Sequence, residues 1–291
     1  MTPAEPPPDG LLLVDKDAGM TSHDVVDLVR RALGTRRVGH AGTLDPFATG
    51  LLVLLVGRAT RLMPYLDAEP KVYEATIRFG AETDTDDATG TVVREAAPPD
   101  EAAMRAGLLP LTGALTQVPP AYSAKQVGGV RAHAAARRGD ALPLAPVSVT
   151  VHAWDDVVVT GMELRATITC SGGTYIRALA RDLGRAAASA AHCAVLRRTR
   201  AGACRVLDAV SLSELRGRGL AALRPALGGL DAGLLHVTLD DEGCRRLRRG
   251  QRVRAQSPGT RAVMLAADGS LVGIAERQGD QWQPTVVLAD G

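Results

Sequence analysis

The sequence predicts an α+β fold, with a mixed, largely antiparallel sheet flanked by helices and a small β-rich module at the C-terminus. Alternating apolar and polar segments are mixed with helical segments, without the strict strand–helix–strand rhythm of a parallel sheet. Turn-rich connections favour hairpins. After Leu230 the sequence changes to short alternating segments. We expect three parts: a flexible N-terminus at 1–10, a large domain at 11–232 and a small domain at 233–291.

The first elements are a strand and a helix. The short apolar run 11–14 predicts the strand. Thr21 or Ser22 can cap the start of the following helix, and Gly34 is a typical C-terminal stop. Between these ends, apolar residues recur at helical spacing: Val25, Val26, Val29 and Leu33.

A long ordered loop is expected at 35–50, because this stretch contains several glycines and no apolar period. It leads into the unbroken apolar run 51–56, which is short enough for a strand buried on both faces. Residues 73–79 alternate as a half-buried strand does. The acidic segment 84–90 predicts a turn, followed by a return strand at 91–93.

The second half of the large domain continues this mixture. A helix is expected at 101–109, and two alternating strands are expected at 147–151 and 157–170. A helix at 174–188 follows, with one apolar face that consists of Ile176, Leu179, Ala180 and Leu183. The C-terminal module is expected to contain a short basic helix at 238–249 and strands at 261–266, 270–275 and 284–288.

The composition is ordinary for a soluble globular protein, with 46% hydrophobic and 23% charged residues. No apolar run approaches the roughly 20 residues that a membrane span needs, and the acidic, proline-rich N-terminus has no signal-peptide pattern. We therefore expect a cytoplasmic protein. The four cysteines form no Cys-x-x-Cys pair and the histidines do not cluster. We expect free thiols and no metal site, and the lack of a phosphate-binding glycine loop predicts no cofactor.

The basic residues are almost all arginine, although the net charge is only +2. The chain has three lysines among its 34 basic residues. The planar guanidinium group of arginine can form two hydrogen bonds to a phosphate and can stack on a nucleic-acid base. The arginines gather at 30–37, 58–61, 197–205 and 245–254, whereas acids concentrate at 82–101. This asymmetry fits a nucleic-acid groove, while solvated charged faces are the simpler alternative.

Asp45, in the glycine-rich loop before the buried strand, is the strongest candidate for chemistry. Pro46 restricts Asp45 to extended conformations. Gly39, Gly42 and Gly50 allow close approach of another backbone or a ligand. On local chemistry alone, the simpler interpretation is a turn aspartate that bonds to its own backbone.

Residues 39–50, Gly-His-Ala-Gly-Thr-Leu-Asp-Pro-Phe-Ala-Thr-Gly, resemble the signature of the TruB family of tRNA pseudouridine synthases, which isomerise the uridine at tRNA position 55, in the T loop. Further segments resemble other blocks of the family in the same order: 15–22, 71–74, 119–125, 170–184 and 196–199. The resemblance covers about residues 10–230. It implies a pseudouridine synthase sheet, and the C-terminal module resembles a divergent PUA-like RNA-binding domain. The chain departs from the family pattern at Asp17, His133 and Gly173.

The resemblance implies a catalytic role for three residues. Asp45 would be the catalytic carboxylate, whether it attacks the ribose or abstracts a proton from it. A carboxylate in a closed site needs a nearby cation to stay ionised, and Arg177 matches the family's arginine. A base inside a folded loop must flip out to react, and Tyr73 matches the residue on which it stacks. The Tyr73 hydroxyl is also a candidate for helping to move the C5 proton.

Six further residues are expected to bind substrate, each with a structural alternative. By resemblance His40 would occupy the space that the extruded nucleotide vacates, or it is a satisfied loop histidine. Leu196 would pack on the flipped base, or it belongs to the core. Tyr175 is a binding residue or packs at a helix start. Lys16 supports the active-site loop or a phosphate. Arg245 and Arg246 contact phosphates, or they lie on a solvated helix.

The leading hypothesis is a monomeric RNA isomerase that binds the T-arm of tRNA and needs neither a cofactor nor a protein partner. The alternative from another class is a non-catalytic tRNA-binding or folding protein on the same fold. The joint presence of Asp45, Tyr73 and Arg177 counts against it. A guide-RNA-dependent relative is a third possibility, and the short termini count against that one.

Overall fold

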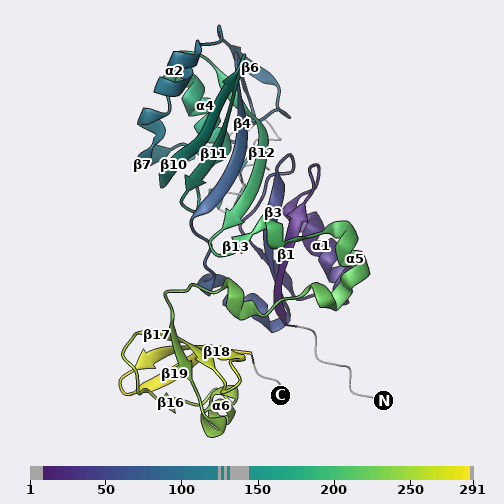
Figure 1. Cartoon of the computed structure of the whole chain (residues 1–291), viewed down its shortest axis with the longest axis vertical. Coiled ribbons are helices and arrows are strands. Elements are labelled where there is room, and N and C mark those ends of the chain that lie inside the picture. The colour runs from purple at the N-terminus through teal and green to yellow at the C-terminus, as the bar shows by residue number, and fades with distance from the viewer. Residues whose placement is uncertain (1–8, 124–125, 128–129, 132–143, 289–291) are drawn as a thin grey trace.

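The computed structural model describes residues 9–123, 126–127, 130–131 and 144–288. Residues 1–8 of the expected flexible N-terminus, together with Lys125 and His133, lie outside the described residues. A ten-stranded sheet forms the main body and a five-stranded sheet forms the C-terminal part (Figure 1). The predicted α+β class is confirmed.

The large sheet has the strand order β14-β1-β3-β12-β4-β11-β10-β7, with β2 on β3 and β13 on β12. Only the β1–β14 and β3–β12 pairs are parallel, so the sheet is mixed and largely antiparallel, as predicted. Its strands are β1 (Gly10–Lys16), β2 (Val38–Ala41), β3 (Thr49–Val56), β4 (Lys71–Phe79), β7 (Gly113–Gln117), β10 (Val147–Thr160), β11 (Glu163–Cys170), β12 (Ala191–Ala201), β13 (Cys204–Arg205) and β14 (Val210–Ser211).

Helices cover parts of this sheet, and two short hairpins stand beside it. The α-helices are α1 (Ser22–Leu33), α2 (Glu101–Ala106), α4 (Ile176–Ala186), α5 (Leu212–Arg218) and α6 (Asp241–Arg248). The hairpins are β5 (Ala81–Thr83) with β6 (Val92–Glu95) and β8 (Gln126–Val127) with β9 (Val130–Arg131). The C-terminal sheet comprises β15 (Leu235–Thr238), β16 (Val253–Arg254), β17 (Arg261–Leu265), β18 (Leu271–Gln278) and β19 (Gln281–Val287).

The ends of α1 follow from local chemistry. The Thr21 hydroxyl accepts a hydrogen bond from the Asp24 amide, and the Asp24 carboxylate accepts one from the Thr21 amide, which makes a capping box. Gly34 ends the helix in the left-handed region, at φ 63°. Both predicted ends are confirmed.

Strand β3 is buried on both faces, as predicted. One face packs in a cluster with the apolar face of α1, through Leu52, Leu54 and Val56. The opposite face belongs to a second cluster, which includes residues of the C-terminal sheet. This second cluster contains Leu51, Val53 and Leu55 together with Val263, Ile274 and Val286. The C-terminal sheet therefore shares an apolar cluster with the face of β3 opposite α1, and β19 contacts the segment 57–65 through Thr285 and Tyr65.

Helix α4 lies on the other half of the large sheet. Its apolar face, predicted from the spacing, packs against β4, β11 and β12 in one cluster that contains Ile176, Leu179, Ala180 and Leu183. Gly184 permits this close approach, because a Cβ there would collide with the backbone of Ala190 and Ala191. The packing fixes the position of the first turn of α4 against the sheet.

Two predictions about the main body were wrong in detail. The expected loop at 35–50 contains the short strand β2, which pairs with β3. The expected strands at 147–151 and 157–170 are the long strand β10 and the strand β11, joined by a turn at 161–162. The register shifts between Asp155 and Val158, and Asp156 has φ 51°. This bulge breaks the alternation inside a continuous strand and so imitates a strand end.

The elements of the C-terminal module agree with the prediction in type and differ in extent. The helix, the central strand and the last strand are displaced by a few residues, which is usual for ends read from a pattern. Strands β15 and β16 were not predicted, because four and two residues are too few for alternation to be a distinctive signal. All four cysteines are free and buried. Among the described residues, none of the helices has the length and apolar character of a membrane span.

Candidate active site

Asp45 and Arg177 form a two-point ion pair, although 132 residues separate them. Asp45 lies in the turn between β2 and β3, and Arg177 lies in the first turn of α4. Arg177 Nε donates to Asp45 Oδ2 at 2.9 Å, and Nη2 donates to Oδ1 at 2.8 Å. The Asp45 side chain is 33% exposed and that of Arg177 only 4%. A buried cation thus stabilises the charge of a carboxylate that remains accessible.

Arg177 is itself held by the backbone and by an acidic turn. Its Nη1 donates to the Thr85 carbonyl at 2.7 Å, and Nη2 donates to the Tyr122 carbonyl at 2.9 Å. Nη1 also lies 3.5 Å from Asp87 Oδ2. Since the guanidinium is planar, these contacts leave one orientation in which both oxygens of Asp45 are met.

The acidic turn at 84–90 is a part of the site that the sequence showed only as a turn. Asp87 Oδ1 accepts from the Thr89 amide at 2.9 Å, which orients the carboxylate beside Arg177. Asp86 Oδ2 lies 2.8 Å from Arg181 Nη1, and burial nevertheless raises the pKa of Asp86 to about 6. The concentration of acids at 82–101 is the one sequence signal for this role.

The backbone on either side of Asp45 is held by the segment that precedes α1 and by the first residue of that helix. The Ser22 hydroxyl accepts from the Leu44 amide at 2.9 Å and donates to the Leu44 carbonyl at 3.1 Å. The Gly19 amide donates to the Pro46 carbonyl at 2.7 Å. Ser22, predicted only as a candidate cap, is therefore a buried support of the Asp45 turn.

Lys16 supports the same turn from the end of β1. It is fully buried, and its Nζ donates to the carbonyls of Asp17 at 2.9 Å, Met20 at 2.8 Å and Pro46 at 3.4 Å. Burial lowers the pKa of the Lys16 ammonium to about 8, and the nearby charge of Asp45 opposes this decrease. Because the three carbonyls occupy the buried ammonium, these contacts favour a role of Lys16 in supporting the Asp45 turn over a contact with an RNA phosphate.

Arg198 is a second residue that the sequence prediction missed. It is fully buried on β12, and its guanidinium donates to the carbonyls of Leu51 at 2.8 Å, Gly42 at 3.0 Å and Thr43 at 3.4 Å. Gly50 has φ 99°, and a Cβ there would collide with the Arg198 backbone. The block 196–199 contains two adjacent arginines, and its pattern did not show which one points inward.

Tyr73 and Leu196 lie together in the cluster that also contains Leu44, next to Asp45 in the chain. Tyr73 is 6% exposed and Leu196 5%. Burial raises the pKa of the Tyr73 hydroxyl; the Arg198 cation opposes this rise, and the charge of Asp45 adds to it. Tyr73 is thus close enough to Asp45 for its charge to act on the hydroxyl, and Leu196 shares the core cluster with Tyr73. Their burial means that a base can stack on the Tyr73 ring only after neighbouring groups move.

His40 and Tyr175 occupy the margins of the site. His40 lies on β2, and its buried Nδ1 has no hydrogen-bond partner among the residues that the structure describes. Burial, followed by the Arg198 cation, lowers its pKa. Tyr175 precedes α4, and its backbone exchanges two hydrogen bonds with the Gln117 side chain, at 2.8 and 3.1 Å. Burial raises the pKa of its hydroxyl, which lies within hydrogen-bonding reach of Ser123.

Arg245 and Arg246 are not brought to Asp45. Both lie exposed on α6, in the C-terminal part at the lower end of Figure 1, whereas α4 lies in the upper half. Arg245 forms an exposed pair with Glu242 at 2.8 Å. A contact of these arginines with RNA would therefore be made at a distance from Asp45.

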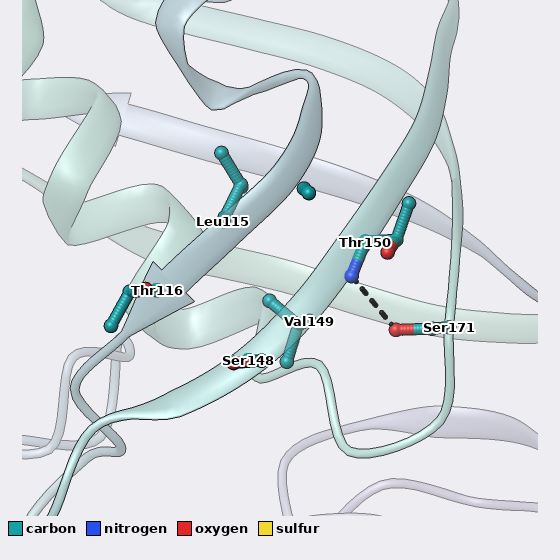
Figure 2. Close-up of a pocket in the computed structure, with 7 residues that line it drawn as sticks. Leu115, Thr116, Ser148, Val149, Thr150 and Ser171 are labelled. Carbon is teal, nitrogen blue, oxygen red and sulfur yellow. Dashed lines mark hydrogen bonds between the residues drawn. The ribbon is translucent and has the colours of Figure 1, made fainter.

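A shallow pocket of about 270 Å³ opens at the edge of the large sheet, between β7 and β10 (Figure 2). Hydroxyl groups dominate its lining, and the Ser171 hydroxyl accepts from the Thr150 amide at 2.9 Å. The residues that line it are Ala114, Leu115, Thr116, Ser148, Val149, Thr150 and Ser171. None of the residues predicted for the site belongs to this set. Ser171 begins the connection from β11 to α4 and so links the pocket to the helix that carries Arg177.

Two solved structures of related fold agree with this architecture. A crystal structure of a Cbf5–Nop10–Gar1 complex contains a chain with a TM-score of 0.73 and 21% identity, covering 96% of this chain and 85% of that one. The structure of an H/ACA RNP bound to a substrate RNA containing 2'-deoxyuridine gives a TM-score of 0.69 at 19% identity, covering 97% and 85%. At such identities the likeness concerns the fold.

Sequence comparison is more specific. Residues 30–176 match the family described as TruB family pseudouridylate synthase (N terminal domain). The tRNA pseudouridine synthase B of Thermobifida fusca (strain YX) is 45% identical over 97% of this chain and 99% of that protein. That of Arthrobacter sp. (strain FB24) is 41% identical over 96% of each. Asp45 lies inside the matched segment and Arg177 directly follows it, and the relatives are similar over almost the whole chain, so the chain belongs to the TruB family of pseudouridylate synthases.

Proposed function

We propose that this chain isomerises a uridine of tRNA to pseudouridine, and that its target is position 55 in the T loop, with Asp45 as the catalytic carboxylate. The coarser part of this function rests on relatives that span almost the whole chain and are named tRNA pseudouridine synthase B. The position of the uridine and the roles of individual residues rest on the geometry of the site and on the resemblance of the motifs.

The observation that carries the proposal is the Asp45–Arg177 pair. Two charge-assisted hydrogen bonds, at 2.8 and 2.9 Å, pair the Asp45 carboxylate with a cation and fix its plane. Isomerisation requires the glycosidic bond to break, the uracil to turn, and C5 to bond to the ribose. An ionised, oriented carboxylate can assist by attack on the ribose or by abstraction of a ribose proton.

The residues around Asp45 support the remaining steps. A uridine of the T loop has to flip out of its stack, and we assign to Tyr73 and Leu196 the binding of the uracil once the groups that cover them move. We assign to His40 the space that the nucleotide leaves, and to Tyr175 a contact at the margin of the site. Lys16 holds the Asp45 turn through the Pro46 carbonyl.

The C-terminal part is proposed as the PUA-like domain, from residue 233 to 291, that binds the T-arm. Arg245 and Arg246 present exposed guanidinium groups on α6, which suits contact with phosphates. We further propose a catalytic domain at 11–232 and a cytoplasmic monomer that acts without a protein partner. Sedimentation of the purified chain tests the monomer.

The test is the release of tritium from C5-labelled uridine in an unmodified tRNA transcript, with the purified chain alone. We expect the wild type to release tritium and to place pseudouridine at position 55. Asp45→Asn should lower turnover by on the order of 10³-fold or more, because the amide neither attacks nor accepts a proton. Binding of tRNA should stay within about threefold, since phosphate contacts dominate affinity.

Asp27→Asn is the matched control, because Asp27 is a half-exposed carboxylate on α1 that pairs with Arg30 at 3.0 Å. It should turn over as the wild type does. Near-normal turnover by Asp45→Asn would refute the assigned role of Asp45. Tight tRNA binding without tritium release by the wild type would favour the non-catalytic alternative, and release only with an added guide RNA would favour the third possibility.

A further inference from the structure

Arg198 is a charged side chain in the interior for which the ion pair of the active site gives no reason. Its relative exposure is 0%. Within the part of the chain that the structure describes, it forms no ion pair with a carboxylate, and its partners are backbone carbonyls. Burial of a guanidinium without an anion is strongly unfavourable unless hydrogen bonds satisfy its donors.

The three carbonyls that Arg198 contacts lie on both sides of Asp45. Gly42 and Thr43 precede Asp45, with N···O distances of 3.0 and 3.4 Å, and Leu51 follows it, at 2.8 Å. One rigid group therefore ties the beginning of the turn to the first part of β3. A lysine could not reproduce this arrangement, because a single ammonium cannot reach three carbonyls that face a planar fork.

The same guanidinium lies within hydrogen-bonding reach of the Tyr73 hydroxyl. Arginine can only donate, so in a hydrogen bond between the two groups the Tyr73 oxygen is the acceptor. Tyr73 and Arg198 stand opposite each other in register on the adjacent strands β4 and β12. The guanidinium is thus a link between the Asp45 turn and the aromatic residue.

We propose that Arg198 is a positioning residue, which holds the Asp45 turn and the Tyr73 hydroxyl in a fixed relation to each other beside the reacting uridine. This inference rests on the proposed function, because it assigns Arg198 a task in the same reaction. Arg198 has no exposed surface and acts through the other two residues. A displacement of about 1 Å between reacting groups can slow a reaction on the order of 100-fold.

A purely structural role predicts a different behaviour from this one. An arginine that only stabilises the fold would lower the melting temperature, and its effect on turnover would be independent of the Tyr73 hydroxyl. A positioning residue lowers kcat at unchanged tRNA affinity, and its effect depends on whether Tyr73 carries its hydroxyl. A double-mutant cycle separates the two, because coupling is measured as non-additivity.

The experiment uses the full chain and C5-tritiated tRNA transcript, with four proteins: wild type, Arg198→Lys, Tyr73→Phe and the double variant. Tritium release, the tRNA dissociation constant and the melting temperature are measured for each. We expect Arg198→Lys to lower kcat about 10- to 100-fold while the dissociation constant changes less than about threefold. If the two residues are coupled, their effects on kcat are not independent. The fold-reduction of kcat in the double variant should therefore be at least about fivefold smaller than the product of the two single-variant reductions.

Arg78→Lys is the matched control, because Arg78 lies exposed on β4 and pairs with Glu163 at 2.6 Å. It should keep the wild-type kcat. The proposal would be overturned if the kcat reduction of the double variant equalled the product of the two single reductions, or if Arg198→Lys kept the wild-type kcat. Failure of Arg198→Lys to fold would overturn it too, since it would make the residue a requirement of the fold. Absence of tritium release from the wild type would instead refute the proposed function.

Discussion

At the scale of single residues, Asp45 has its charge and its position controlled by different partners. Arg177 stabilises the charge through two hydrogen bonds from a side chain that is 4% exposed. Ser22 and Gly19 hold the backbone of Leu44 and Pro46 on either side. Because these interactions act on different atoms, a substitution at one partner should change either the charge or the position.

A prediction at this scale concerns the ring and the hydroxyl of Tyr73. Tyr73→Phe keeps the aromatic ring and should keep the tRNA affinity of the wild type. Tyr73→Ala should weaken the productive complex by about 1–3 kcal/mol, the usual contribution of one base stacked on an aromatic side chain. Tritium release and tRNA binding measure both effects. Equal binding and turnover of the two variants would remove the stacking role.

At the scale of elements, the segment that precedes α1 and the turn before β3 form one unit. Ser22, the first residue of α1, bonds to both backbone groups of Leu44, and Lys16, at the end of β1, reaches the Pro46 carbonyl. These contacts give a physical explanation for the block at 15–22, which was recognised by its resemblance to the family. It is the support of the Asp45 turn.

Ser22→Ala tests this support. It leaves the buried Leu44 amide and carbonyl without their side-chain partner, which costs about 1–3 kcal/mol. We expect a lower melting temperature and a kcat reduced about tenfold, because the Asp45 turn loses its fixed position. Ser213→Ala, at an exposed serine near the start of α5, should change neither quantity. An unchanged kcat in Ser22→Ala would show that the turn is held well enough by its other contacts.

The elements also show which patterns can be interpreted locally. The ends of α1 were predictable, because capping and the left-handed Gly34 involve only neighbours in the chain. The division of β10 was mispredicted, because the bulge near Asp156 breaks the alternation without ending the strand. Strand β15 was missed, because its partner β17 is distant in the sequence and an alternation of only four residues is too short to be distinctive.

At the scale of the whole molecule, the C-terminal sheet is joined to the large sheet through a shared apolar cluster and through contacts with the segment 57–65. Val263, Ile274 and Val286 share a cluster with Leu51 and Leu55 of β3. Arg261 lies over the Tyr65 ring, 5.1 Å from its centroid, and adds a contact between the two parts. This packing sets the position of α6 relative to Asp45.

If α6 contacts the T-arm, the double variant Arg245→Ala with Arg246→Ala should show a weaker salt dependence of tRNA binding than the wild type. Each lost phosphate contact should decrease the slope of log K against log salt by about 0.7–0.9. The kcat should be unaffected, since α6 lies away from Asp45. Arg105→Ala on α2, where Arg105 pairs with Glu101, is the control and should keep the wild-type slope. A slope that is unchanged in the double variant would contradict the phosphate-contact role.

The sequence by itself determined the α+β class, the caps of α1, the two-faced burial of β3 and, through the ordered blocks, the family. Only the tertiary structure decided which side chains meet. It paired Asp45 with Arg177, brought Asp87 to the same guanidinium and turned Arg198 inward against the turn. The physical reason is range: caps and alternation depend on near neighbours in the chain, whereas these contacts depend on which strands become adjacent.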